Sequence, residues 1–194
     1  MSETPRILAF AGSARKDSFN KKLVAIAAAG AREAGAHVTL IDLAVFPLPL
    51  MDQDLEEQIG VPENARKLKD LFAAHHGLLI SAPEYNSSIT PLLKNTIDWV
   101  SRPEPPDVTM LHYISGKTAA LISASPGPMG GKRGLAIVRS LLINISVTVL
   151  PQSLSIARAA QEFTETGDLI DENKHALAKA VGAALAEKLI TLLG

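Results

Sequence analysis

The sequence contains no cysteine, few aromatic residues and no excess of either charge. Without cysteine, disulfides, thiolate metal sites and cysteine nucleophiles are excluded. The 19 basic and 20 acidic residues leave a formal net charge of -1. Such a balance gives no general attraction for nucleic acid or for an anionic membrane. We therefore expect that any bound anion is held by a local group of side chains.

Long apolar runs are also missing. No stretch approaches the roughly 20 residues of a membrane span, and the N-terminal MSETPR has neither the basic flank nor the apolar segment of an export signal. We expect a soluble cytoplasmic protein. The chain has 194 residues, of which 47% are hydrophobic, and shows no repeat or linker-like change in composition. We therefore expect a single domain over residues 1–194.

Apolar segments typical of buried strands alternate with segments of helical periodicity. Strands that are apolar on both faces indicate a parallel sheet covered by helices on both sides. Five such strands predict an α/β three-layer sandwich of the flavodoxin-like order 2-1-3-4-5, with a binding crevice at the carboxyl ends of strands 1 and 3. The predicted strands are 6–11, 37–41, 77–82, 118–123 and 147–150; the predicted helices are 20–34, 62–75, 91–100, 132–142 and 171 onward.

The segment between the first predicted strand and helix reads GSARKDSFN, residues 12–20. A strand-to-helix turn directs backbone N–H groups and the positive helix end at one point. Ser13, Ser18 and Asn20 add neutral donors, and Arg15 adds a guanidinium suited to phosphate. The plainer alternative is that Ser18 and Asn20 only cap the helix while Arg15 is solvated.

The kind of phosphate follows from the glycines that are missing. Gly12 is the only glycine between residues 10 and 29, so the G-x-G-x-x-G fingerprint of dinucleotide sites is absent. The segment GGKRG, at 130–134, has Arg133 where a P-loop needs Ser or Thr. The turn therefore indicates a terminal monophosphate, as in FMN.

A second motif follows the third predicted strand. Residues 82–102 read APEYNSSITPLLKNTIDWVSR, and together with GSARKDSFN they resemble the NADPH-dependent FMN reductase family, which includes bacterial quinone, chromate and azo-dye reductases. The family patterns G-S-x-R-x-x-S-x-N, P-E-Y-N and L-K-N-x-I-D-W are all matched without a gap, and SASPGPMGG at 123–131 resembles the third flavin loop. The match runs from the first strand to about residue 140.

The resemblance implies an FMN site built from three loops. The phosphate would be held by Ser13, Arg15, Ser18 and Asn20, with Phe19 in the same stretch. The isoalloxazine would be lined by Pro83, Glu84, Tyr85 and Asn86, with Ser125 and Gly127 along its other edge. No side chain is expected to act as acid, base or nucleophile, and no metal is expected, since the flavin carries the redox chemistry.

These observations predict an FMN-dependent oxidoreductase that passes hydride from NADPH or NADH to a small acceptor. Quinones, azo and nitro compounds, chromate-like oxyanions and free flavin are all candidates. One alternative is a flavodoxin-type electron carrier, which the near-neutral charge and the single loop aromatic Tyr85 disfavour. Another is a sugar-phosphate enzyme, which leaves PEYN unexplained. The resemblance also implies a homodimer or homotetramer with flavins near subunit boundaries.

Two further features have plainer alternatives. The helix at 91–100 spreads apolar residues, Trp99 among them, over more than one stripe, which favours either a dimer interface or a core helix. Glu84 is a candidate partner for Arg102 across a subunit boundary.

His75 and His76 end a predicted helix. Adjacent residues do not share a helix face, so we expect a favourable effect on the helix dipole and no metal site. The segment 42–62 is predicted as a long loop, and its length suggests a function. Its acidic cluster, defined by Asp52, Asp54, Glu56 and Glu57, either forms a solvated surface or shapes the entrance to the flavin.

Overall fold

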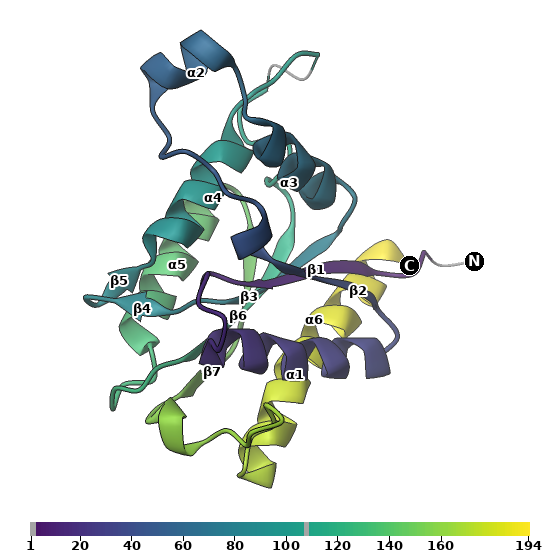
Figure 1. The fold of residues 1–194 in the computed structure, drawn as a ribbon. Helices are drawn as coiled ribbons and strands as arrows, with labels where there is room; N and C mark the ends of the chain where they lie inside the picture. Colours follow the sequence, from purple (N-terminus) through teal and green to yellow (C-terminus); the bar gives the residue numbers. More distant parts are fainter. Residues whose placement is uncertain (1–2, 107–108) are drawn as a thin grey trace.

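The central sheet has five parallel strands, seen edge-on among the helices in Figure 1. The computed structural model describes residues 3–106 and 109–194. The strand order is β2-β1-β3-β6-β7. Because β6 and β7 are the fourth and fifth predicted strands, the predicted order 2-1-3-4-5 is confirmed. The strands are β1 (Arg6–Ala11), β2 (His37–Asp42), β3 (Gly77–Ser81), β6 (Thr118–Ala124) and β7 (Thr148–Ile156).

Helices cover both faces of this sheet, which confirms the three-layer α/β fold. In Figure 1, α1 (Phe19–Glu33) and α6 (Glu172–Leu193) lie on one face. On the other face lie α3 (Glu63–Ala73), α4 (Pro91–Ser101) and α5 (Lys132–Asn144). No helix in the described ranges is both long and apolar enough to cross a membrane.

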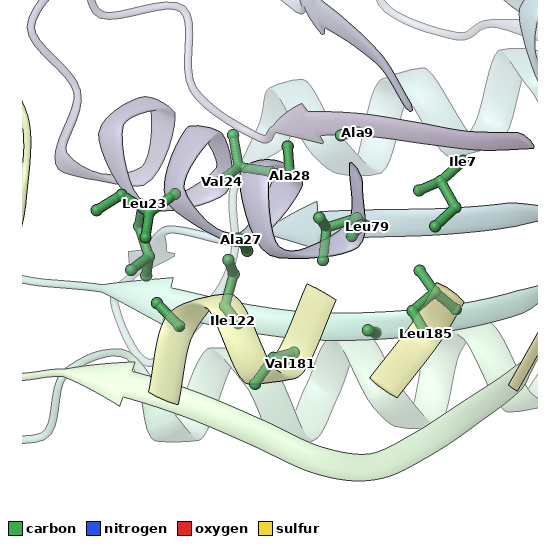
Figure 2. Close-up of a cluster of buried hydrophobic side chains, with 14 of the residues drawn as sticks. Ile7, Ala9, Leu23, Val24, Ala27, Ala28, Leu79, Ile122, Val181 and Leu185 are labelled. Atoms are coloured by element: carbon green, nitrogen blue, oxygen red, sulfur yellow. The ribbon is translucent and has the colours of Figure 1, made fainter. Parts of the chain in front are cut away.

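The core under α1 and α6 is built from aliphatic residues of both helices and the sheet (Figure 2). The two helices also contact each other closely, because both have glycine at the crossing. A Cβ on Gly30 would lie 2.1 Å from the Lys179 carbonyl oxygen, and one on Gly182 would lie 1.8 Å from the Ala27 oxygen. This backbone-to-backbone packing fixes α1, and with it the turn at its N-terminus.

The segment 42–62 is not the continuous loop that the sequence predicts. It contains a 3₁₀ turn at Leu43–Val45 and the helix α2 (Gln53–Ile59). Asp42 and Asp52 begin these elements, since their carboxylates accept hydrogen bonds from the Ala44 and Asp54 N–H groups at 2.9 Å. Pro47, Pro49 and Pro62 made the segment look like a continuous loop. The 3₁₀ turn lies before Pro47 and α2 lies between Pro49 and Pro62, and each begins at an aspartate cap.

The PEYN segment forms a small hairpin that the sequence did not predict. Its strands are β4 (Glu84–Tyr85) and β5 (Ser88–Ile89), which pair antiparallel. Asn86 and Ser87 make the turn with φ of 50° and 63°. Two successive positive φ values characterise the tight turn whose twist suits a two-residue hairpin.

The last strand is longer than predicted, because β7 continues through Pro151 to Ile156. It lies at the edge of the sheet, where a missing N–H does not break an internal ladder. The register shifts between Ala119 and Leu121 opposite this proline.

Candidate functional site

Three loops meet at the carboxyl ends of β1, β3 and β6. Backbone hydrogen bonds of 2.9 Å join Gly12 N–H to the Ser81 oxygen and Ala82 N–H to the Ile122 oxygen. A cavity of about 220 Å³ opens between the loops, and every predicted site residue lines it except Asn86 and Gly127. Ala124 and Pro126 line it as well, although the sequence did not single them out. The lining residues among those predicted are Ser13, Arg15, Ser18, Phe19, Asn20, Pro83, Glu84, Tyr85 and Ser125.

A larger hollow of about 460 Å³ lies along α1 and α6 and is lined by three lysines. Each lysine already has a protein partner. Lys21 pairs with Asp42 at 2.7 Å, Lys179 pairs with Glu33 at 2.6 Å, and Lys22 donates to the Thr164 oxygen at 3.4 Å. We therefore place the candidate site in the smaller cavity, where the motif residues converge.

The turn after β1 offers donors to an anion. Ser13 is buried, and its hydroxyl oxygen accepts the Arg15 N–H at 3.3 Å, which leaves the hydroxyl proton to donate elsewhere. Ser18 precedes α1, but its side chain does not cap the helix. The N–H groups of the first helical turn therefore have no side-chain acceptor from Ser18. These groups fit a phosphate, which presents only acceptor oxygens.

Arg15 lies at the rim of the cavity. Its guanidinium donates to the Asp17 carbonyl oxygen and stacks over the Phe19 ring, with the guanidinium carbon 5.1 Å from the ring centroid. The side chain is exposed, yet it has two defined contacts and lines the cavity. Arg15 is therefore not a freely solvated arginine.

Asn20 is used differently from the other polar residues of the turn. Its side chain is buried; Nδ2 donates to the Ala124 oxygen at 2.7 Å, and Oδ1 accepts from Ala124 N–H at 3.0 Å and from the Ser81 hydroxyl at 2.9 Å. These contacts connect the start of α1 to the ends of β3 and β6. The capping alternative is therefore wrong for Asn20, whose carboxamide holds the loops together.

Close packing against α4 fixes the same turn from the other side. A Cβ on Gly12 would lie 2.9 Å from the Cβ of Leu93, so only glycine fits without a shift. Thr90 caps α4: its hydroxyl accepts the Leu93 N–H at 3.3 Å and donates to the Gly12 oxygen at 2.7 Å. Thr90 is not among the residues predicted for the site, although threonine directly before a proline is a common helix start.

Glu84 fixes the PEYN hairpin to α5. Its carboxylate accepts the N–H of Gly134, the third residue of α5, at 2.8 Å. Gly131 precedes this helix and has no side chain to cap it, so Glu84 serves as the cap from a distant loop. Within the chain, Arg102 pairs with Glu56 at 2.7 Å. The suggested pairing of Glu84 with Arg102 across a subunit boundary stays a prediction.

The hairpin presents Tyr85 at the cavity, where 56% of the side chain is exposed. Asn86 occupies the turn and does not line the cavity. On the opposite loop, the Ser125 hydroxyl accepts the Gly127 N–H at 3.2 Å. Ser125 thus shapes this loop and lines the cavity, whereas Gly127 contributes its backbone to the turn.

The L-K-N-x-I-D-W motif is structural within this chain. Trp99 is fully buried and donates to the Pro49 oxygen at 2.8 Å. Asn95 accepts the Met51 N–H at 2.8 Å and donates to the same Pro49 oxygen at 2.9 Å. Residues of the chain itself therefore cover Trp99 on α4, which supports the core-helix alternative for this side chain. The dimer-interface alternative for the helix stays a prediction.

The acidic cluster lies away from the cavity. Glu56 on α2 pairs with Arg102, which follows the C-terminal end of α4. At the N-terminal end of α4, Thr90 donates to the Gly12 oxygen in the turn after β1. An 11-residue helix separates these ends by about 16 Å. The suggested role of the cluster at the flavin entrance therefore has no support in the geometry.

His75 does not act as a cation on a helix dipole. Burial lowers its pKa, and its two ring nitrogens lie 2.5 Å from the Leu71 oxygen and 2.7 Å from the Thr39 hydroxyl. Burial and the nearby Arg6 guanidinium likewise lower the pKa of His76. Both shifts favour neutral rings, which interact with a helix dipole more weakly than a cation does. The contact of His75 with the Leu71 oxygen still satisfies a carbonyl in the last turn of α3.

Known proteins resemble this chain over nearly its whole length. A reductase from Pseudomonas aeruginosa, named as an NAD(P)H-dependent FMN reductase, is 32% identical over 179 residues, which cover 91% of each chain. A quinone reductase from Escherichia coli K12 is 31% identical over 175 residues, or 89% of this chain and 88% of its own.

Solved structures give the same result. The structure of FerB, a flavoenzyme NAD(P)H:(acceptor) oxidoreductase from Paracoccus denitrificans, superimposes with a TM-score of 0.77 at 26% identity, over 98% of this chain and all of the other. The family model for NADPH-dependent FMN reductases matches residues 5–161. The chain therefore belongs to the NADPH-dependent FMN reductase family of oxidoreductases.

Proposed function

We propose that the protein uses FMN and NAD(P)H to reduce small acceptors, with quinones as the leading class. The observation that carries the proposal is that three loops line one cavity: the GSARKDSFN turn after β1, the PEYN hairpin after β3 and the loop after β6. When bound there, FMN would supply the redox chemistry, because a flavin accepts hydride from a nicotinamide and returns the electrons to an acceptor. The named relatives, an FMN reductase and a quinone reductase, support this function.

The chain's own residues bind and orient the cofactor in this proposal. Ser13, Ser18, Arg15 and the first N–H groups of α1 hold the phosphate. Pro83 and Tyr85 contact the ring system from the hairpin, with Ser125 opposite them. Asn20 and Glu84 act on the positions of these loops through the contacts described above. Hydride transfer requires no acid or base from the protein, so the proposal assigns no side chain that role.

Two features favour a reductase over an electron carrier. The formal net charge of -1 provides little electrostatic attraction to a basic redox partner. The aromatic side chain presented by the hairpin, Tyr85, is more than half exposed, which suits a face where a second ring stacks.

The function is tested by adding NADPH and a benzoquinone to the purified protein reconstituted with FMN. We expect flavin absorption that NADPH bleaches, followed by continuous oxidation of NADPH when quinone is present. A protein that binds FMN but leaves the nicotinamide absorbance unchanged would identify a carrier. A protein that binds no FMN would favour the sugar-phosphate alternative.

The same assay ranks the acceptors and donors. Quinone, azo dye, nitro compound, chromate and free FMN are compared at equal concentration, each with NADPH and with NADH. We expect quinones to be reduced fastest.

The protein is further proposed to be a cytoplasmic homodimer or homotetramer with a single domain over 1–194. Light scattering during size exclusion measures the oligomer; a monomer at micromolar concentration would contradict that part.

A further inference from the structure

Two aromatic rings and one guanidinium contact one another at the edge of the cavity. The Arg15 guanidinium lies over one face of Phe19, 5.1 Å from the ring centroid. Phe163 stacks on the same ring, with centroids 5.6 Å apart and an interplanar angle of 18°. Arg15 and Phe19 belong to the candidate site, whereas Phe163 lies in the segment between β7 and α6, beyond the end of the family match at residue 161.

The segment that carries Phe163 is held in place by its own contacts. Phe163 forms an antiparallel bridge with Leu169, which is buried in the core under α1 and α6. The N–H of Ile170 donates to the Glu162 oxygen at 2.9 Å. The Glu162 carboxylate pairs with Lys174 of α6 at 2.7 Å. Phe163 is thus a fixed surface against which Phe19 can rest.

A fixed aromatic surface prepares Arg15 for binding an anion. An exposed arginine side chain loses much of its rotamer freedom when a ligand orders it. A guanidinium held over an aromatic ring has already lost part of its rotamer freedom before the ligand binds. It keeps its full positive charge, which attracts a phosphate. Phe19 can stack with Arg15 only if the Phe19 ring keeps its orientation. Phe163 packs directly against the Phe19 ring and so restricts that orientation.

We propose that Phe163 is a positioning residue for the cofactor phosphate, acting through Phe19 on Arg15. The inference rests on the proposed function, because it assumes that FMN occupies this cavity. It extends the site to a residue outside the motifs and outside the matched span. Phe163 does not touch the phosphate in this proposal; it limits the positions open to the arginine that does.

The test compares two ligands that differ only in the phosphate. FMN and riboflavin are titrated into the full-length apoprotein, and flavin fluorescence reports binding. For Phe163→Ala we expect FMN affinity to fall roughly two- to tenfold, the range of cation–π and aromatic stacking contributions. Riboflavin affinity should stay within twofold of wild type. Phe163→Tyr, which keeps the ring, should restore FMN affinity to within about twofold.

The coupling to Arg15 is tested in a double variant. In the Arg15→Ala background, Phe163→Ala should no longer change FMN affinity, because the group it positions is gone. Phe46→Ala is the matched control: it removes the same ring from another half-buried position, in the segment that covers the other face of the sheet. It should lower the unfolding temperature and leave the ratio of FMN to riboflavin affinity unchanged.

Three results would overturn the inference: an equal loss for FMN and riboflavin, an undiminished effect without Arg15, or wild-type FMN affinity in Phe163→Ala. Each leaves the proposed function intact, because wild-type protein still binds FMN. If wild-type protein binds neither ligand, the proposed function and this inference both fail.

Discussion

Polar side chains gather at both ends of the central sheet, and the two ends use them differently. At the amino ends of the strands, Arg6 donates to the Ala74 oxygen at 2.6 Å and pairs with Glu3 at 2.8 Å. Lys117 donates to the His75 oxygen at 2.6 Å. At the carboxyl ends, Ser13 and Arg15 line a cavity.

The difference shows how a polar cluster indicates function. At the amino ends, the named polar groups are partners of one another, so they contribute to the fold. At the carboxyl ends, the hydroxyl proton of Ser13 and the N–H groups of Phe19 and Asn20, the first of α1, have no partner among the described contacts. The next N–H, that of Lys21, already bonds to the Ser18 carbonyl oxygen. A ligand with acceptor oxygens can supply what those donors lack.

The largest expected difference between the two ends is between two arginines, Arg6 at the start of β1 and Arg15 in the turn after it. Arg15→Ala should weaken FMN binding by roughly 1.5–3 kcal/mol, the usual range for a charged hydrogen-bonding partner. Arg6→Ala should leave FMN affinity unchanged and lower the free energy of unfolding, because its partners are protein groups. Titration with FMN and urea unfolding measure the two quantities. If both variants lost FMN affinity equally, the two ends would not differ as we describe.

Helix caps allow a second comparison. Glu84→Ala should reduce stability by about 0.5–2 kcal/mol, as caps usually do, and should also reduce FMN affinity, since the hairpin with Tyr85 loses its attachment to α5. Asp171→Ala removes the cap of α6, where the carboxylate accepts the Lys174 N–H at 3.0 Å. We expect a similar loss of stability there with FMN affinity unchanged.

Glu84→Gln separates the effect of the Glu84 charge from that of its hydrogen bond with the Gly134 N–H. It keeps an oxygen that can accept from Gly134, so most of the stability and of the FMN affinity should remain. Wild-type FMN affinity in Glu84→Ala would contradict the role of the hairpin attachment.

The fold was predictable because its signals are local and repeated. Strands such as Ile7–Phe10 and Leu78–Ile80 are apolar on both faces, so both faces must be buried. Burial on both sides requires helices on both faces of the sheet. The motif in the turn after β1 then predicted where the candidate site lies, since the carboxyl ends of neighbouring parallel strands converge.

What could not be predicted depends on contacts between distant residues. Asn20 bonds to a strand end 104 residues away, and Glu84 caps a helix 50 residues away. A sequence shows that a side chain can accept or donate, but not which distant group it meets. The apolar stripe around Trp99 was ambiguous for the same reason, because its cover comes from Pro49 and Val61, in a segment that looked like a loop.

The smallest expected effect is the pH dependence of stability, which we expect from histidines at the amino ends of the strands. Burial lowers the pKa of His75 below its usual value of 6.5, so the unfolded chain takes up a proton more readily than the folded protein. Stability is therefore fully present above pH 6.5 and declines as the pH falls below it. The urea midpoint should drop between pH 7.5 and 5.5, and drop less in His75→Gln, which does not titrate. The pKa of His76 is lowered as well, so part of the pH dependence should remain in His75→Gln. An unchanged pH dependence in the variant would remove His75 from this explanation, whereas FMN affinity, set at the other end of the sheet, should be equal in variant and wild type at both pH values.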